Sequence, residues 1–224
     1  MHDKKYCYPN SNVLINKKDI RNAKELLDAE ILYTGIRLME LQECPISGKF
    51  DFKHLCKIHK YIFQDIYGWA GKVRTIDIGK GNMFCYVQNI SGYAEIVFNK
   101  YFPSCYSVKA DRDRFVEVLA DNYADLNALH PFREGNGRSQ REFARELCLE
   151  CGYVFDLSRT THKDMLEASI YAFNKADNSK LLEIFKKAVI PIGEYEPPDI
   201  SYINILTSDD LEIEDIANSY EYYE

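Results

Sequence analysis

One stretch of twelve residues, HPFREGNGRSQR from His130 to Arg141, carries most of the chemistry in this sequence. It contains a histidine, the carboxylate of Glu134, a Gly-Asn-Gly turn and two arginines three residues apart. A histidine titrates near neutral pH and can take a proton from a hydroxyl. The combination suits attack by a hydroxyl on a bound nucleotide phosphate, where positioning and charge neutralisation supply most of the rate.

The flanking residues predict that this stretch joins two helices. Apolar residues recur at helical spacing over residues 114–129 and again over residues 143–151. Pro131 disfavours a helical conformation in the residue before it, so the first helix should end near His130. The Gly-Asn-Gly turn then stands at the entrance of the second helix. Backbone N–H groups and the positive end of the helix dipole attract anions at such an entrance.

The two arginines and the carboxylate suggest which anion this entrance holds. Arg138 and Arg141 share a face of the first helical turn, and two guanidinium groups there can grip two further phosphates of a triphosphate. Glu134 would repel those phosphates unless a cation intervened, and Mg²⁺ is the natural bridge. Each part alone has an ordinary explanation, such as a helix end, a turn or a solvated face. Their joint arrangement favours the nucleotide site.

The stretch resembles the signature of the Fic family, His-x-Phe-x-Asp/Glu-Gly-Asn-Gly-Arg-x-x-Arg, and every specified position is matched. The resemblance implies an all-α fold, a Fic-type helical bundle with a short β-hairpin flap. It also implies that AMP is transferred from ATP to a Tyr, Ser or Thr hydroxyl of a target protein. The relative Doc, which transfers phosphate, lacks the full glycine-arginine pattern. The alternatives are transfer of another phosphate-linked group, such as UMP or phosphate, and an inactive nucleotide-binding module.

The resemblance also assigns roles to individual residues. It implies that His130 is the general base and that Glu134 holds Mg²⁺. The residues expected to bind ATP are Phe132, Gly135, Asn136, Gly137, Arg138 and Arg141, together with Lys80, Gly81 and Asn82 upstream.

A hairpin is predicted upstream of the motif. Residues 73–78 and 83–87 are rich in β-formers and flank a glycine-rich turn, although an ordinary exposed loop is the alternative. The Fic family places a β-hairpin flap before its motif, and residues 76–84 resemble it. A flap edge can pair with an extended segment of a target through main-chain hydrogen bonds. The residues expected to dock the target are Ile76, Asp77, Ile78, Gly79 and Phe84.

Composition limits the remaining possibilities. The 224 residues, 46% of them hydrophobic, suit one compact domain with an appendage. Seven irregularly spaced cysteines favour reduced thiols in the cytoplasm. We expect no signal peptide, no membrane span and, because no basic stripe is present, no direct nucleic-acid binding. Cys148 and Cys151 are expected to pack in the core, and His54 and His59 do not share a helix face that would bind a metal.

The acidic residues gather near the C-terminus. Residues 194–224 hold ten Asp or Glu and no Lys or Arg, which accounts for the net charge of −7. We therefore divide the chain into an N-terminal helical part at 1–50, a Fic core with flap and motif at 51–192, and an acidic tail at 193–224.

Regulation is suggested by both ends of the chain. Residues 6–10 resemble the leader of the cell filamentation toxin branch, which modifies type II DNA topoisomerases and is inhibited by a small antitoxin. The antitoxin donates a helix whose glutamate pairs with the second motif arginine, here Arg141. Candidates for such a contact within this chain are Glu212, Glu221 and Glu224, although their surroundings depart from the inhibitory motif. The alternatives are a separate antitoxin and a solvated acidic tail.

Overall fold

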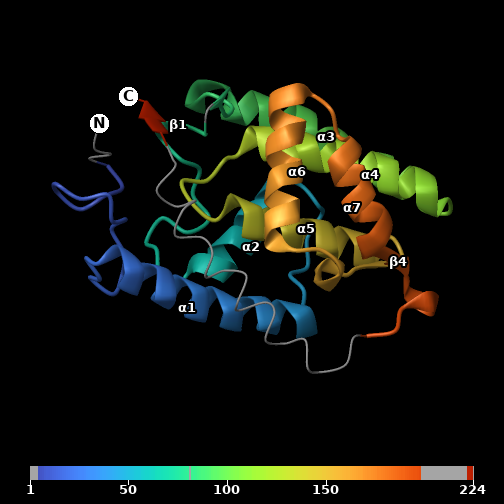
Figure 1. The fold of residues 1–224 in the computed structure, drawn as a ribbon, viewed down its shortest axis with the longest axis horizontal. Helices are drawn as coiled ribbons and strands as arrows, with labels where there is room; N and C mark the ends of the chain where they lie inside the picture. Colours follow the sequence, from blue (N-terminus) through green and yellow to red (C-terminus); the bar gives the residue numbers. More distant parts are fainter. Residues whose placement is uncertain (1–4, 81, 198–220, 224) are drawn as a thin grey trace.

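The computed structural model describes residues 5–80, 82–197 and 221–223 (Figure 1). Its helices are α1 Ala23–Glu43, α2 Phe52–Phe63, α3 Ile90–Ser107, α4 Arg112–Leu129, α5 Asn136–Glu150, α6 His162–Lys175 and α7 Ser179–Ala188. Its strands are β1 Asp77–Lys80, β2 Asn82–Met83, β3 Tyr153–Phe155, β4 Val189–Pro191 and β5 Glu221–Tyr223. The expected helical bundle with a short hairpin is confirmed. No helix in the described part is long and apolar enough to cross a membrane.

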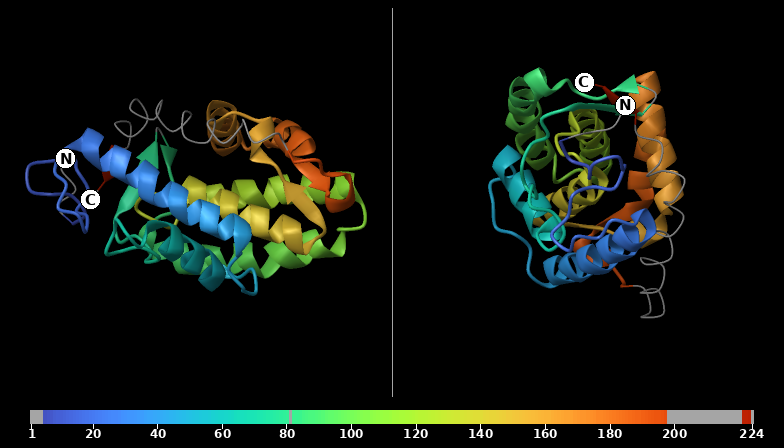
Figure 2. Two further views of the ribbon diagram at one scale, coloured as in Figure 1. Left: turned by 90° about the horizontal axis from the view of Figure 1, so that it is seen from below. Right: turned by 90° about the vertical axis from the view of Figure 1, so that its left-hand side faces the viewer.

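Helix α5 lies in the middle of the bundle, surrounded by the other helices (Figure 2). It packs against α2, α4 and β3. Its apolar stripe includes Phe143, Leu147 and Cys148, none of which is exposed to solvent. Even its polar residues Ser139 and Gln140 are buried, and their side chains bond to backbone carbonyls of the bundle. The motif at the N-terminal end of α5 therefore starts from a helix that the core holds firmly.

The apolar spacing of residues 18–41 predicts a helix capped by Asn16 or Asp19, but α1 begins later, at Ala23, and neither residue is its cap. The side chain of Asn22 accepts hydrogen bonds from the backbone N–H groups of residues 24 and 25, which is the capping geometry. Asp19 has a φ of 52°, which is not helical. The side chain of Asn16 instead holds the preceding loop through the N–H groups of residues 18 and 20.

Helix α3 is longer than predicted, and one strand pair was not predicted. The sequence pattern predicts a helix over residues 93–101, but α3 extends from Ile90 to Ser107 and contains Pro103. Strands β3 and β4 form an antiparallel pair in which Val154 lies opposite Ile190. Both strands are short, and each directly follows a helix in the sequence, so their β-forming residues extend the helical apolar pattern.

The predicted hairpin exists but is shorter than expected. β1 and β2 pair antiparallel, with Gly79 opposite Met83. The first strand begins at residue 77 rather than 73, because Arg74 donates its N–H to the carbonyl of Pro131 (2.9 Å) outside the sheet. On the other side, the N–H of Cys85 donates to the carbonyl of Ala128 (3.1 Å). Both ends of the hairpin are thus hydrogen-bonded to residues 128–131, where α4 ends and the motif begins.

A third strand lies on the free side of β1. The sheet order is β2-β1-β5, and β5 is antiparallel to β1, with Ile78 opposite Tyr222 and Gly79 opposite Glu221. Figure 1 shows this C-terminal strand beside β1. The edge of the flap that was expected to receive a target strand is therefore paired with the chain's own C-terminal segment.

Candidate active site

His130 stands at the turn between α4 and α5. It caps α4 in a left-handed conformation, with φ 43° and ψ 59°, and its N–H donates to the carbonyl of Leu126 (3.3 Å). A non-glycine residue in this region is uncommon and places the side chain where a helical residue would not. Pro131 then carries the chain away from the helix axis.

The ring of His130 is held on two sides. Its Nδ1 lies 3.2 Å from the carbonyl oxygen of Asn127. Because a carbonyl only accepts, Nδ1 is the protonated nitrogen, and Nε2 is left as the nitrogen that can take a proton. The ring stacks on Phe84 of the flap, with centroids 3.7 Å apart and planes 11° apart. The histidine is 7% exposed, so its ring orientation is set by its protein neighbours.

Arg74 joins the flap to the histidine. Its Nε donates to the carbonyl of His130 (2.9 Å), its Nη1 to the carbonyl of Ile76 (2.8 Å) and its Nη2 to the carbonyl of Cys85. Burial lowers the pKa of Arg74, and the nearby Asp77 opposes that shift. Sequence reasoning missed this residue. The available signal was a basic residue inside a run of β-formers. In the folded chain Arg74 is 1% exposed.

Asn136 fixes the motif loop through its side chain. The Oδ1 of Asn136 accepts from the N–H of Phe132 (2.9 Å), and its Nδ2 donates to the carbonyl of the same residue (2.8 Å). Asn136 is 3% exposed. Its side chain is therefore used to shape the loop, and a ligand would meet its backbone N–H.

His59 of α2 supports the same loop from below. Its Nε2 donates to the carbonyl of Glu134 (2.9 Å), and its Nδ1 accepts from the N–H of Gly71 (2.8 Å). Burial lowers the pKa of His59 to about 3, so the ring is neutral at physiological pH. The ring also stacks on Phe132 at 3.8 Å. His54, in contrast, faces Glu146 at 2.9 Å, so the two histidines of α2 have separate structural partners.

The two glycines of the motif are required for different reasons. Gly135 has a φ of 80°, and a Cβ there would lie 2.1 Å from the ring of Phe63. A side chain is excluded both by the backbone conformation and by the buried ring. A Cβ on Gly137 would lie 3.1 Å from Nη1 of Arg141. Gly137 therefore leaves room for the guanidinium group of Arg141 to lie against the first turn of α5.

These residues form an anion nest at the start of α5. The first intrahelical hydrogen bond runs from the N–H of Ser139 to the carbonyl of Gly135 (3.2 Å), so the N–H groups of residues 136 and 137 point out of the helix end. Arg141 adds positive charge. Glu134 lies at the rim, where its carboxylate accepts from the N–H of Gly135 (2.8 Å).

A divalent cation fits this arrangement only together with a phosphate ligand. Glu134 supplies one carboxylate, and within the described residues no three His, Cys, Asp or Glu side chains form a metal cluster. Mg²⁺ commonly binds through one or two carboxylates, waters and the phosphate oxygens of a substrate. The donor set at Glu134 is of that kind.

Arg138 points toward α1. Its guanidinium group pairs with Glu30, donates to Oγ1 of Thr34 (3.2 Å) and lies 4.7 Å from the ring centre of Phe63. It also approaches Glu134 at 3.9 Å. Neither Glu30 nor Thr34 was expected at the site.

The remaining flap residues lie as follows. Ile78 is fully buried, and its carbonyl accepts from the N–H of Phe84 (3.2 Å). The carboxylate of Asp77 accepts from the N–H of Val87 (2.7 Å), which closes the base of the hairpin. Ile76 precedes β1 and is half-buried. These three side chains thus shape the flap. A strand that pairs with the edge of β1 would meet mainly backbone N–H and C=O groups.

The hairpin turn, which was predicted to contribute to nucleotide binding, has its described side-chain contact with α6. Nδ2 of Asn82 donates to Oδ1 of Asn174 on α6 (2.6 Å). Lys80 pairs with Asn82 along the backbone, and Gly81 lies outside the described residues. Their role in binding ATP remains a prediction.

The tail candidates are also placed only in part. Glu212 and Glu224 lie outside the described residues. The backbone of Glu221 belongs to β5, opposite Gly79 of the flap. The tail therefore reaches the flap, and the expected pairing of a tail glutamate with Arg141 remains a prediction.

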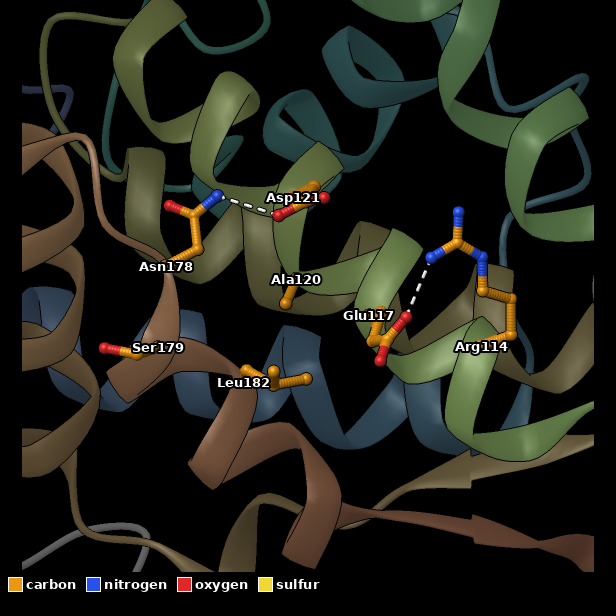
Figure 3. A pocket seen from close by; sticks show the side chains of 7 residues that line it. All are labelled: Arg114, Glu117, Ala120, Asp121, Asn178, Ser179 and Leu182. Carbon is orange, nitrogen blue, oxygen red and sulfur yellow. Dashed lines mark hydrogen bonds and ion pairs between the residues drawn. The ribbon is translucent and has the colours of Figure 1, made fainter.

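A surface pocket lies elsewhere, between α4 and the start of α7 (Figure 3). Its volume is about 280 Å³. Its lining includes Asp121, which accepts from Nδ2 of Asn178 (2.9 Å), and Glu117, which pairs with Arg114 (2.8 Å). Two carboxylates in this lining disfavour a phosphate, and no motif residue contributes. We therefore place the functional site at the nest beside His130.

Comparison with known proteins identifies the family of this chain. Residues 49–148 match the model of the Fic/DOC family. The chain is 33% identical over 192 residues to the "Probable protein adenylyltransferase Fic" of Salmonella typhimurium, covering 85% of this chain and 94% of that protein. It is 39% identical over 169 residues to "Protein adenylyltransferase VbhT" of Bartonella schoenbuchensis. That match covers 75% of this chain but only 35% of VbhT, so this chain corresponds to about a third of that protein.

A solved structure shows the same fold. It is the N-terminal Fic domain of a VirB-translocated Bep effector protein from Bartonella quintana, with bound ADP. The TM-score is 0.79 at 28% identity, and the match covers 83% of this chain and 94% of that one.

Proposed function

This chain belongs to the Fic/DOC family and is a nucleotidyltransferase, and from this premise we propose that it transfers AMP from ATP to a hydroxyl of a target protein. The observation that carries the proposal is the meeting of two features within the motif. His130 is held with Nδ1 on a carbonyl, and an anion nest begins five residues later. The names of the Salmonella and Bartonella relatives support the same reaction.

In the proposed reaction the target hydroxyl oxygen attacks the α-phosphorus of ATP. The hydroxyl proton passes to Nε2 of His130, which the carbonyl of Asn127 keeps as the accepting nitrogen. The bond from the α-phosphorus to the oxygen that bridges to the β-phosphate breaks, and pyrophosphate leaves with the electron pair. The nest and Arg141 bind the phosphates and neutralise the charge that develops on them.

We propose that Glu134 holds Mg²⁺ together with the phosphates. The cation would supply charge neutralisation on the phosphate oxygens. Within the chain, His59 fixes the carbonyl of Glu134, and the nest N–H of Gly135 orients its carboxylate. The protein thus holds this carboxylate at the rim of the nest before any ligand arrives.

The flap is proposed to align the target. Strand addition to the edge of β1 would rely on main-chain hydrogen bonds and would accept many target sequences. Phe84 of the flap stacks on His130. A target strand paired with β1 would therefore take a fixed position relative to His130, the proposed general base. On the resemblance of residues 6–10 to the cell filamentation leader, a type II DNA topoisomerase is the first target to test. We place the reaction in the cytoplasm, which supplies ATP and keeps thiols such as the seven free cysteines reduced.

We propose that the acidic tail competes with the target at this edge. β5 pairs with residues 77–79, so a target strand has to displace it. A tethered strand benefits from a high effective concentration even when its intrinsic affinity is low. A separate small antitoxin acting at Arg141 is the competing explanation for inhibition.

Isotope labelling tests the reaction. The protein is incubated with a type II topoisomerase or a bacterial lysate and with ATP labelled at the α- or the γ-phosphate. Transfer of the α-label with release of pyrophosphate is expected. Transfer of the γ-label would identify phosphate transfer. In a parallel reaction with α-labelled UTP, labelling of the target from UTP but not from ATP would identify UMP transfer. Nucleotide binding without any transfer, across the targets supplied, would favour an inactive binding module.

A further inference from the structure

A buried carboxylate on α1 meets the first motif arginine. Glu30 is 6% exposed, and its Oε1 pairs with Nη2 of Arg138. Thr34, one helical turn later and 1% exposed, accepts from Nη1 of the same guanidinium group (3.2 Å). The two α1 side chains therefore bind two different nitrogens of one arginine, which fixes both the position and the plane of the guanidinium group.

The second carboxylate oxygen of Glu30 is also engaged. The hydroxyl of Tyr67 donates to Oε2, and Tyr67 is 1% exposed. Burial, reinforced by the charge of Glu30, raises the pKa of the Tyr67 phenol well above its ordinary value. The phenol therefore stays protonated and remains a donor. The ring of Phe63, 4.7 Å from the guanidinium carbon, covers one face of Arg138.

The buried cluster around Glu30 carries an energetic cost. Burying a carboxylate carries a desolvation penalty that is offset only by good pairing, and apolar residues in its place are often at least as stable. Glu30 and Thr34 interrupt the buried stripe of α1 that contains Leu26 and Leu41. Both lie outside residues 49–148, so the family match does not reach them.

We infer that Glu30 is a positioning residue that holds Arg138 for the outer phosphates of the bound nucleotide. The inference rests on the proposed function, because it deepens the account of the same phosphate site. Thr34 and Tyr67 complete the support, the first by binding Arg138 and the second by binding Glu30.

The competing carboxylate explains why such support matters. Glu134 lies 3.9 Å from the same Nη2 that pairs with Glu30. Without Glu30, Arg138 is drawn toward Glu134, and both groups leave the positions that a triphosphate and a cation require. An arginine that is already oriented loses less conformational entropy when a phosphate binds.

The test compares the affinities for ATP and AMP, because AMP lacks the outer phosphates. Isothermal titration calorimetry is applied to the wild type, Glu30→Gln, Arg138→Ala and the double variant. We expect Glu30→Gln to weaken ATP binding by roughly tenfold, on the scale of a charge-assisted hydrogen bond, and to leave AMP binding within about twofold. In the Arg138→Ala background, Glu30→Gln should have no further effect on ATP affinity.

Two controls separate positioning from a general structural role. Asp28→Asn makes the same charge change on the exposed side of α1 and should leave both affinities unchanged. If Glu30→Gln does not fold, Thr34→Val and Tyr67→Phe remove single hydrogen bonds and should each show a smaller loss confined to ATP.

Three results would overturn the inference. They are equal loss of ATP and AMP affinity, a Glu30→Gln effect that persists without Arg138, and tighter ATP binding by Glu30→Gln. The last result would make Glu30 a competitor of the phosphates. Because the readout is affinity, a failure of AMP transfer leaves this test intact and is recognised separately by the labelling experiment.

Discussion

The anion nest at the start of α5 and the flap both adjoin His130, but different interactions hold them. In the nest, side chains fix the backbone: Asn136 binds both peptide groups of Phe132, and His59 binds the carbonyl of Glu134. In the flap, Arg74 holds three carbonyls at the base, and the strand edge beyond it pairs backbone to backbone.

This difference suggests a division of labour. The nest depends on particular residues at particular positions, which suits recognition of one chemical group, a polyphosphate. The edge of β1 offers peptide groups that every sequence possesses, which suits protein targets of varied sequence. Substitutions in the nest should therefore change nucleotide binding or chemistry, and substitutions at the edge should change the use of the target.

The largest effect is expected from His130→Ala. Loss of a general base costs roughly 10²–10⁴ in rate, whereas the proposal assigns phosphate binding to the nest and the arginines. AMP transfer should therefore be abolished while ATP affinity stays within a few-fold. Initial rates with α-labelled ATP, compared with ATP titration of the same preparation, check this. Near-normal labelling would remove His130 from the mechanism.

Gly135→Ala should damage the nest far more than Gly137→Ala. The first places a Cβ against the buried ring of Phe63 in a left-handed conformation, and we expect a cost of roughly 2–4 kcal/mol with loss of ATP binding. The second meets only the flexible end of Arg141 and should weaken ATP binding several-fold without a comparable loss of stability. Urea unfolding and ATP titration of both variants check the order. Similar losses of stability in both would contradict the geometry of Gly135.

The flap edge is tested by Asp77→Pro, with Asp77→Ala as the matched control. The peptide groups of Ile78 face β2, because its carbonyl accepts from the N–H of Phe84, so the neighbouring Asp77 presents its N–H to the edge that β5 occupies. Proline at Asp77 removes that N–H, whereas alanine keeps it and equally lacks the carboxylate. We expect target labelling to fall roughly tenfold more than ATP affinity for the proline variant, on the scale of one main-chain hydrogen bond. Proline at Ile76, outside β1, should have a smaller effect. Equal loss of both activities would mean that the flap serves the nucleotide.

Acidification should weaken the support beneath the nest. The folded pKa of His59 is about 3, below the unfolded value near 6.5, so the unfolded state binds more protons between these values. The stability contributed by neutral His59 is present above about pH 6.5 and is lost as the pH falls toward 3, with a slope of about 1.4 kcal/mol per unit. Urea unfolding between pH 7 and 4.5, compared with His59→Gln, isolates this contribution. An identical pH dependence in the variant would exclude it.

The smallest effect is expected from removing the tail. Truncation after Ile192 removes β5 and exposes the edge of β1, so target labelling should rise a few-fold at equal ATP, mainly through a lower KM for the target. In the full chain, alternate residues of an antiparallel strand direct their N–H groups toward the neighbouring strand. Proline at one of the two neighbouring positions Tyr222 and Tyr223 should therefore remove a bond to β1 and reproduce the rise in labelling. Tyr222→Phe and Tyr223→Phe are the controls. Equal rates before and after truncation would favour a separate antitoxin.

Local patterns predicted most of the helices but not all of their limits. Arg112–Leu129 and Asn136–Glu150 were expected within two residues, because an apolar stripe, a proline and a glycine mark them in the sequence. The start of α1 was wrong, since Asn16, Asp19 and Asn22 are all plausible caps and only the loop geometry selects among them. The predicted start of β1 at residue 73 was wrong, because the backbone N–H of Arg74 donates to the carbonyl of Pro131, which is distant in the sequence.

The sequence by itself determined which residues form the motif and predicted their chemistry, because the residues expected to act together lie within twelve positions. Contacts across larger separations were decided only by the tertiary structure. Glu30 and Arg138 are 108 residues apart, and β5 meets β1 from the far end of the chain. The periodicity of a sequence predicts that a side chain is buried, but it does not predict which residue pairs with a buried polar group. That choice follows from how the helices pack, and here it directs Arg138 toward Glu30 of α1.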